Sequence, residues 1–164
     1  MSASVVSGGS ASTPPIGKAN VVRNGADVTV VTISLSVQHA LDVAGELDQG
    51  IDVEVLDLRS RVPLDRQAIL ESVAKTGHLV VVAVDYLSFG MSGEVLATVS
   101  EHDPTMLMAP ARRVPVPDVP LPYLRRSSKR CCLATPELRR RSALFSRHDR
   151  RDPGAHSSTV EGGP

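Results

Sequence analysis

Aromatic side chains are nearly missing from this sequence. Phe, Trp and Tyr together make up 2% of its 164 residues, and Trp is absent. Hydrophobic residues still account for 41% of the chain, which is enough to bury one sizeable core. We therefore expect a single folded domain whose core is aliphatic.

Cysteines and long apolar runs are scarce as well. The two cysteines, Cys131 and Cys132, are adjacent, and a bond between neighbouring cysteines closes a strained ring, so they form no disulfide framework. No apolar run approaches the ~20 residues of a membrane helix. The first basic residue is Lys18, which does not fit a secretory or Arg-rich transit leader. These absences predict a soluble, cytoplasmic protein with no membrane partner.

The formal net charge is zero, but only as an average over two unlike segments. Residues 1–123 hold 8 Lys and Arg against 14 Asp and Glu, whereas residues 124–164 hold 10 against 4. We expect three parts: a disordered lead-in over residues 1–13, a folded domain over 14–123, and a basic, disordered tail over 124–164.

Five segments of the expected domain have the composition of strands. They lie at residues 19–23, 27–34, 51–58, 78–85 and 112–118. Asn24-Gly25 separates the first two, and because such a pair is typical of hairpins, we expect these strands to be antiparallel neighbours. The alternating apolar and acidic residues of 51–58 favour a position toward an edge. The apolar segment 78–85 is typical of a central parallel strand, and the prolines of 112–118 favour an edge strand.

Three segments between these strands have the apolar spacing of helices, at residues 37–47, 63–77 and 94–102. Gly77 is expected to cap the end of the second helix, and Ser92 the start of the third. The alternation predicts an α/β fold, a three-layer α/β/α sandwich. Its mixed, mainly parallel sheet has about five strands, one of them antiparallel.

Few residues offer chemistry, and each has a structural explanation that we favour. Asp57 and Asp85 end strands at the sheet edge where open α/β sheets bind ligands, but each is more often a cap for the following turn. Residues 89–94 place two glycines and a serine before a helix, yet they lack the Lys and the spacing of a phosphate-binding motif.

The histidines and cysteines do not combine into a metal or nucleophile set. They are His39, His78, His102, Cys131, Cys132, His148 and His156. We therefore predict no catalytic, cofactor-binding or metal-binding residue in this chain.

Four blocks of the expected domain form a recognisable series. They are "PIGKA", "EVLDLRS" followed by "PLD", "TGHLVVV", and "PDVPLPY". In order and separation they resemble the C-terminal, transketolase-like domain of the beta subunit of 2-oxo acid dehydrogenase decarboxylase components. Those enzymes act on pyruvate, branched-chain 2-oxo acids or acetoin, and the resemblance does not identify which.

The resemblance implies an oxidoreductase that uses thiamine diphosphate and magnesium. In that family a pyrimidine-binding domain precedes "PIGKA", whereas 13 residues precede Pro14 here. We therefore expect a truncated beta subunit that binds no cofactor and is inactive alone.

The same resemblance implies partners. In the family this domain serves association with the alpha subunit and docking to the dihydrolipoyl acyltransferase core, and self-association is also expected. The alternative is a non-enzymatic remnant or a free-standing interaction domain.

The segment after Tyr123 departs from the family's pattern, which continues with a Pro-Leu-Glu run. One permitted set of codons for Leu124–Cys132, read two bases later, encodes Pro-Pro-Leu-Glu-Gln-Ala-Val-Leu, which is that continuation. Our hypothesis is that residues 124–164 are the product of a frameshift. A basic arm that binds nucleic acid is disfavoured, because Phe145 is its only aromatic residue.

The nucleotide sequence tests the frameshift hypothesis. We expect codons 124–132 to encode that family-like peptide in the shifted frame, and any other peptide there contradicts the hypothesis. Salt-dependent binding of the intact chain to nucleic acid, lost on truncation after Tyr123, would support the basic arm instead.

Overall fold

The computed structural model describes residues 15–47, 50–116 and 118. The predicted lead-in and tail lie outside these residues, as do Cys131, Cys132, His148 and His156. No helix within the described ranges combines the length and the apolar character needed to span a bilayer.

Five strands form one sheet in the order β1-β3-β2-β4-β5. They are β1 (Asn20–Arg23), β2 (Val28–Thr32), β3 (Val53–Asp57), β4 (Leu79–Tyr86) and β5 (Arg112–Val116). β1 runs antiparallel to β3, and every other neighbouring pair is parallel. The mixed, mainly parallel sheet is confirmed, and so is the edge position of β5.

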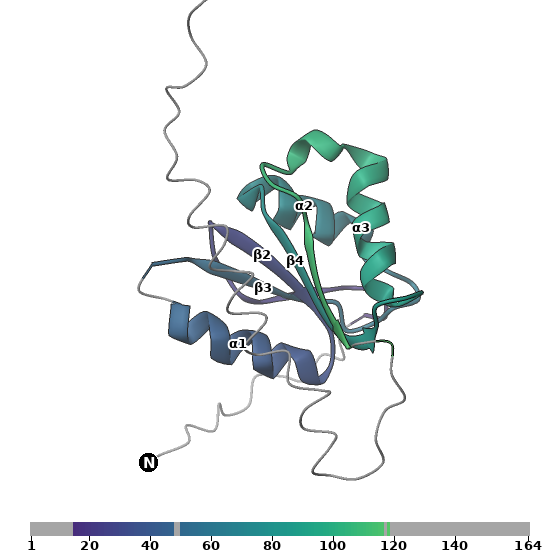
Figure 1. Cartoon of the computed structure of the whole chain (residues 1–164), viewed down its shortest axis with the longest axis horizontal. Helices are drawn as coiled ribbons and strands as arrows, with labels where there is room; N and C mark the ends of the chain where they lie inside the picture. The colour runs from purple at the N-terminus through teal and green to yellow at the C-terminus, as the bar shows by residue number, and fades with distance from the viewer. Residues whose placement is uncertain (1–14, 48–49, 117, 119–164) are drawn as a thin grey trace, which may run out of the picture.

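Helices cover both faces of the sheet (Figure 1). α1 (Leu35–Leu47) lies on one face, and α2 (Arg66–Thr76) and α3 (Met91–His102) lie on the other. A short 3₁₀ helix, η1 (Pro104–Met106), follows α3. All five residues of β2 are buried, as expected for a strand that is covered from both sides. The three-layer sandwich is therefore confirmed.

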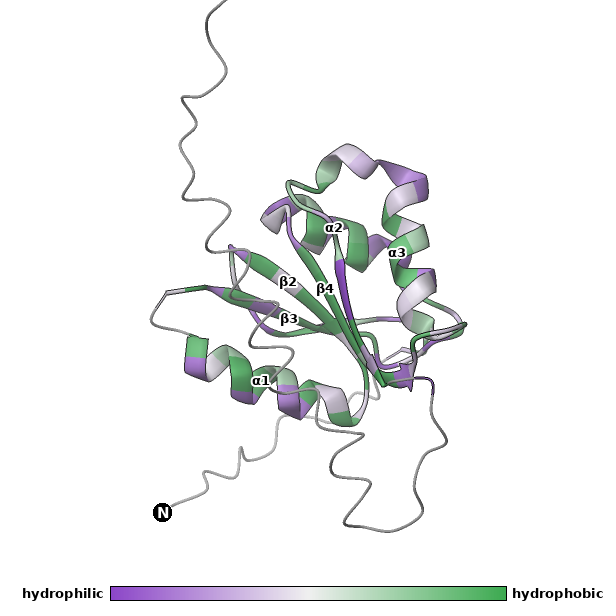
Figure 2. Ribbon diagram, viewed as in Figure 1, coloured by the Kyte–Doolittle hydropathy of each residue, from purple (hydrophilic) through white to green (hydrophobic). Residues whose placement is uncertain are grey.

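Two aliphatic cores fill the spaces between the layers. One packs Ala40, Val43 and Ala44 of α1 against the sheet, and the other packs residues such as Ile69 and Val99 of α2 and α3 against the opposite face. Figure 2 shows the hydrophobic residues concentrated on the strands and on the helix faces that meet them. Neither described core contains an aromatic side chain, which confirms the expected aliphatic packing.

The predicted hairpin at Asn24-Gly25 is wrong. β3 lies between β1 and β2, so the connection passes across the amino end of β3 instead of turning back on itself. Gly25 is required there for close approach, because a Cβ would lie 2.3 Å from the backbone nitrogen of Glu54. Non-local pairing with an almost wholly buried strand thus overrides the local turn signal.

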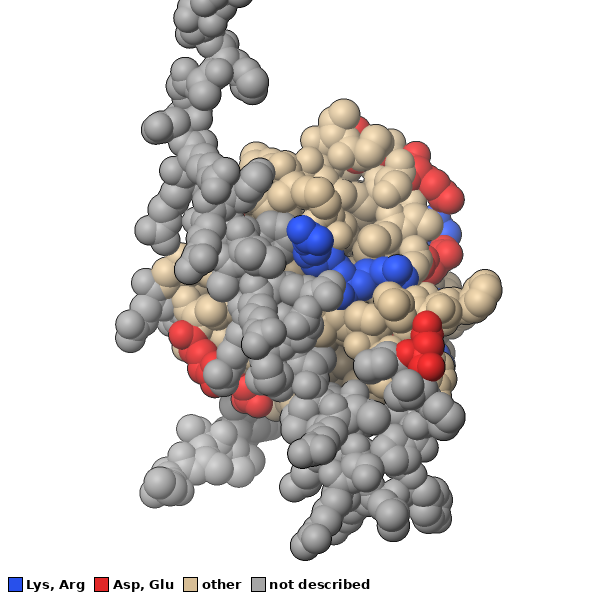
Figure 3. Space-filling view, viewed as in Figure 1, with Lys and Arg blue, Asp and Glu red and all other residues tan. Residues whose placement is uncertain are grey.

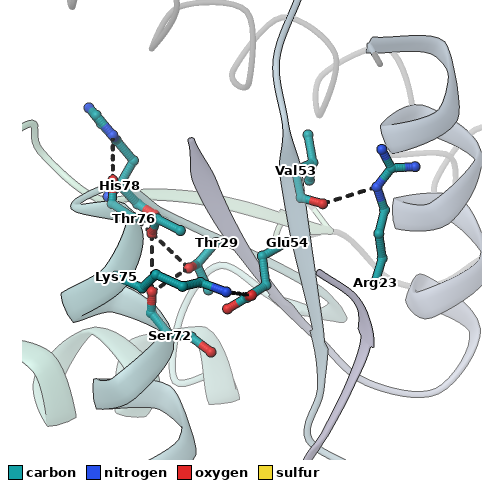
Figure 4. Close-up of polar contacts among 8 residues, drawn as sticks. All are labelled: Arg23, Thr29, Val53, Glu54, Ser72, Lys75, Thr76 and His78. Carbon is teal, nitrogen blue, oxygen red and sulfur yellow. Dashed lines mark hydrogen bonds and ion pairs between the residues drawn. The ribbon is translucent and has the colours of Figure 1, made fainter. Parts of the chain in front are cut away.

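The predicted position of residues 51–58 toward an edge is also wrong. β3 has a neighbour on each side, and the side chain of Glu54 is 1% exposed. Its carboxylate pairs with the ammonium group of Lys75, which reaches it from the last turn of α2 (Figure 4). A carboxylate can be buried at this point because the helix supplies the counter-charge.

Replacing Gly25 with alanine tests the crossing. We expect Gly25→Ala to lower the free energy of unfolding by about 2 kcal/mol or more, because the added methyl group overlaps the backbone of β3. Gly45→Ala is the matched control, since Gly45 lies within α1 with nothing near its Cβ position. That change should raise stability by ~0.5–1 kcal/mol. Urea unfolding followed by far-UV circular dichroism measures both; equal effects would contradict the assignment.

Candidate functional site

The carboxyl ends of β2, β3 and β4 open into a crevice of about 740 Å³. Its walls are formed by Ile33, Ser34, Leu35, Asp57, Arg59, Arg61, Ala83, Val84, Asp85 and Met91. A hollow of about 290 Å³ adjoins it and shares Arg61, Val84, Asp85 and Met91. Parallel strands end at one edge of a sheet, and open α/β sheets usually bind ligands at that edge.

The structure brings Asp57 and Asp85 to this same crevice, as the sequence indicated. They come from β3 and β4, the strands on either side of β2. Asp57 Oδ1 accepts a hydrogen bond from the backbone nitrogen of Arg59 at 3.0 Å. Asp85 Oδ2 accepts one from the backbone nitrogen of Ser92 at 3.4 Å. Each carboxylate therefore caps the turn or helix that follows it, which is the structural role we favoured.

The predicted capping role of Ser92 is wrong. Gly90 is the N-cap of α3, and Ser92 lies in the first turn of the helix. Asp85 takes over the capping, and Gly90 leaves room for it, since a Cβ on Gly90 would lie 2.8 Å from Asp85 Oδ2.

Unpaired buried polar atoms collect at this edge of the sheet. Within the described ranges they are Thr32 Oγ1, Ser36 Oγ, Asp85 Oδ1 and Ser92 Oγ. Each belongs to the carboxyl-terminal half of β2 or β4, or to the first turn of the helix that follows. A buried polar atom without a partner is destabilising, so such a concentration marks the part of a fold that is least optimised for stability alone.

Backbone strain marks the same edge. Ser34, Arg59 and Phe89 are the non-glycine residues of the described chain with positive φ, at 60°, 56° and 57°. One follows each of β2, β3 and β4, and each lines the crevice or the adjoining hollow. Left-handed backbone at bulky residues persists only where the surroundings enforce it, and it clusters at functional sites.

The loop after β4 is tied to the end of β5. Ser88 donates from its backbone nitrogen to Asp118 Oδ1 at 3.1 Å and from its hydroxyl to Oδ2 at 2.6 Å. Arg113 adds a hydrogen bond from Nη1 to the carbonyl of Leu87 at 3.1 Å. The Ser88 hydroxyl, followed by its backbone N–H, lowers the pKa of Asp118. These contacts join the loop after β4 to the "PDVPLPY" block through Asp118.

The blocks "PIGKA" and "PLD" also meet, on the other side of the edge. Gly17 has a φ of 81° and packs so closely on Pro63 that a Cβ would lie 2.6 Å from its Cγ. Asp65 Oδ2 accepts a hydrogen bond from the backbone nitrogen of Ala19 at 3.1 Å, while Oδ1 caps α2 by accepting one from Ala68. Both blocks therefore hold the chain before β1 against the start of α2.

The described histidines are not brought together. His78 Nδ1 lies 3.1 Å from the carbonyl oxygen of Asp27 and 3.0 Å from that of Thr76, so this nitrogen carries the proton (Figure 4). His39 lies within α1 and His102 ends α3. Among the residues that the structure describes, no group of three or more His, Cys, Asp and Glu could hold a metal ion.

Sequence reasoning missed Arg59 and Arg61, although both line the crevice. Arginines in a loop after a strand usually face solvent, so their type gives no local signal. The available signal was topological: they follow directly on Asp57, at a strand end that faces the ligand edge.

The link between Ser88 and Asp118 predicts a pH-dependent contact. Because the folded-state pKa of Asp118 lies below its ordinary value of 3.8, the contact contributes fully above that pH and is lost as the pH falls through the folded-state pKa. Ser88→Ala should raise the Asp118 midpoint toward 3.8, measured by NMR titration of the carboxyl carbons. Asp103, whose pKa is lowered by the hydroxyl and N–H of Thr105, is the internal control and should not change. An unchanged Asp118 midpoint contradicts the assignment.

Comparison with known proteins places this architecture in a family. The sequence model of the family "Transketolase, C-terminal domain" matches residues 17–137. The chain is 45% identical over 111 residues to the 2-oxoisovalerate dehydrogenase subunit beta of Bacillus subtilis, a match that covers 66% of this chain and 34% of that protein. It is 46% identical over 110 residues to the mitochondrial pyruvate dehydrogenase E1 component subunit beta-1 of Arabidopsis thaliana, covering 66% and 30%.

A solved structure agrees with the sequence relatives. A split-gene transketolase, described as an inactive beta4 tetramer, superposes with a TM-score of 0.65 at 27% identity, over 79% of this chain and 42% of that one. The chain thus spans about a third of the length of the curated relatives named above. The matched residues include the whole described sheet, its helices and the crevice. This chain therefore belongs to the transketolase C-terminal domain family, in the form found in the beta subunits of 2-oxo acid dehydrogenases.

Proposed function

We propose that this domain serves subunit association in a thiamine-diphosphate-dependent 2-oxo acid dehydrogenase decarboxylase component. Its partners are the alpha subunit and the dihydrolipoyl acyltransferase core. In this role the chain contributes a contact surface, while thiamine diphosphate, magnesium and the groups that act on the 2-oxo acid are held by other parts of the enzyme.

The observation that carries the proposal is the concentration of exposed apolar side chains at the carboxyl edge of the sheet. Six of them lie within or directly beside the loops that follow β2, β3 and β4: Leu35, Val62, Val84, Tyr86, Leu87 and Phe89. We call this set the apolar rim. Exposed apolar side chains gathered in one region, rather than scattered singly, are typical of surfaces that contact another protein.

Phe89 is the most exposed residue of the rim. Its side chain is fully exposed, at 109% of the reference area, in a chain whose described cores contain no aromatic residue. An aromatic side chain that is left outside an aliphatic core is well suited to act as an interface anchor. The Ser88–Asp118 contact ties down the loop that carries Phe89, which reduces the ordering needed on association.

The relatives support the same role. Two of them carry names of beta subunits, and the structural neighbour is described as a beta4 tetramer. Proteins whose names denote subunits act in assemblies, and this chain matches about a third of such a subunit. A domain of this kind is expected to keep an apolar surface for its partners.

Replacing Phe89 with serine tests the proposal. Sedimentation velocity measures association of the full chain alone, and of the chain mixed with the alpha subunit and acyltransferase core of the Bacillus subtilis relative. We expect the wild-type chain to associate and Phe89→Ser to weaken association at least about tenfold, because an interface anchor contributes about 2 kcal/mol or more.

Val22→Ser is the matched control, since Val22 is an exposed apolar residue of β1 that lies outside the rim. It should leave association unchanged. A wild-type chain that stays monomeric with every partner would overturn the proposed function. Equal weakening by both variants would show that association uses a different surface.

A further inference from the structure

The crevice beneath the apolar rim is lined by charged groups of both signs. Arg59 and Arg61 line it, and neither guanidinium group forms a hydrogen bond or ion pair with another residue in the described part of the chain. Asp85 lines it too: its Oδ2 accepts the backbone N–H of Ser92 and its Oδ1 is shielded from water, so Asp85 acts on a ligand through the charge of its carboxylate. A ligand of this crevice would therefore need an acceptor for the arginines, and the Asp85 carboxylate would favour a positive group beside it.

The fourth charged residue of the crevice is already engaged. Asp57 Oδ1 accepts the backbone N–H of Arg59, so Asp57 fixes the loop that carries the arginines. With two arginines and two aspartates around one space, a simple anion would face the carboxylates and a simple cation would face the guanidinium groups. A molecule that carries both charges avoids either repulsion.

The remaining walls are aliphatic. Ile33, Leu35, Val84 and Met91 line the crevice, and Leu35 and Val84 are 55% and 42% exposed. Covering such side chains with an apolar group removes their surface from water. The volume of about 740 Å³ lies within the range of small-molecule sites.

From these contacts we infer that the crevice binds a small zwitterion of the α-amino acid class with an aliphatic side chain. Its carboxylate contacts Arg59 and Arg61, whose planar donor groups match the two oxygens of a carboxylate. Its ammonium group lies on the Asp85 side of the crevice, where the carboxylate attracts it, and its side chain packs against Leu35 and Met91. This binding goes beyond the proposed assembly role and does not require it.

Three probes of similar shape separate the contributions of the two charges. L-leucine carries both, 4-methylpentanoate lacks the ammonium group, and 3-methylbutan-1-amine lacks the carboxylate. Each is titrated into the ¹⁵N-labelled full chain and followed by two-dimensional NMR. Leucine should give saturable shifts confined to residues 33–35, 59–61 and 84–91, and each single-charge probe should bind at least about tenfold more weakly.

Substitutions locate the two ends of the ligand. Arg61→Gln and Asp85→Asn should each weaken leucine binding at least about tenfold. Arg112→Gln is the control, because Arg112 is an exposed arginine of β5 that lines neither cavity. Figure 3 shows Lys and Arg side chains gathered over β5 on the face in view. Arg112→Gln should leave binding unchanged.

Several outcomes would overturn the inference. These are no saturable shift with leucine up to about 10 mM, equal binding of 4-methylpentanoate, and equal weakening by Arg112→Gln and Arg61→Gln. If Asp85→Asn does not fold, the comparison of leucine with 4-methylpentanoate on the wild-type chain still decides whether an ammonium contact exists. Association through the apolar rim is measured separately, so either idea can fail without the other.

Discussion

The parallel alignment of β2, β3 and β4 is the constraint on which the rest of this domain depends. It forces each return connection to cross a face of the sheet, so helices cover both sides and the strands must be apolar along nearly their whole length. It also brings three strand ends to one edge. The crevice, the loops with positive φ and the first turns of α1 and α3 all lie there for that reason.

That edge combines features that stability alone would not select. Buried hydroxyl groups without partners, left-handed backbone at Arg59 and Phe89, and exposed aliphatic side chains each reduce the stability or solubility of an isolated domain. The opposite features are found within the sheet. There, Glu54 is matched by Lys75, and Thr29 is hydrogen-bonded to the carbonyl of Ser72 at 2.9 Å. The domain thus separates a well-satisfied interior from an edge arranged for contact.

Sequence patterns predicted the parts of this fold that depend on local periodicity. The helices and strands lie close to the expected segments, because apolar spacing reports which face of an element is covered. The order of the strands was not predictable from Asn24-Gly25, since the competing partner, β3, comes nearly 30 residues later in the chain. The burial of Glu54 was missed for a similar reason: a lone acidic residue indicates solvent, and its partner lies in another element.

The position of the candidate site was predicted from the sequence, but only some of the residues that line it were. The rule that ligands bind at the carboxyl ends of parallel strands located Asp57 and Asp85 correctly. It gave no indication of Arg59 or Arg61, which line the crevice from the loop after β3. The capping assigned to Ser92 failed because α3 begins earlier, at Met91, and Asp85 of the preceding strand accepts the backbone N–H of Ser92 itself.

The aliphatic core has a consequence for how this protein can be observed. The chain has no Trp, and of the residues in the described structure its aromatic side chains, Tyr86 and Phe89, are both on the surface at the apolar rim. The described cores therefore contain no chromophore, and Tyr86, at 41% exposure, lies where a partner or ligand can reach it. The emission of Tyr86 should respond to whatever covers the rim, so this domain carries a natural optical reporter of binding.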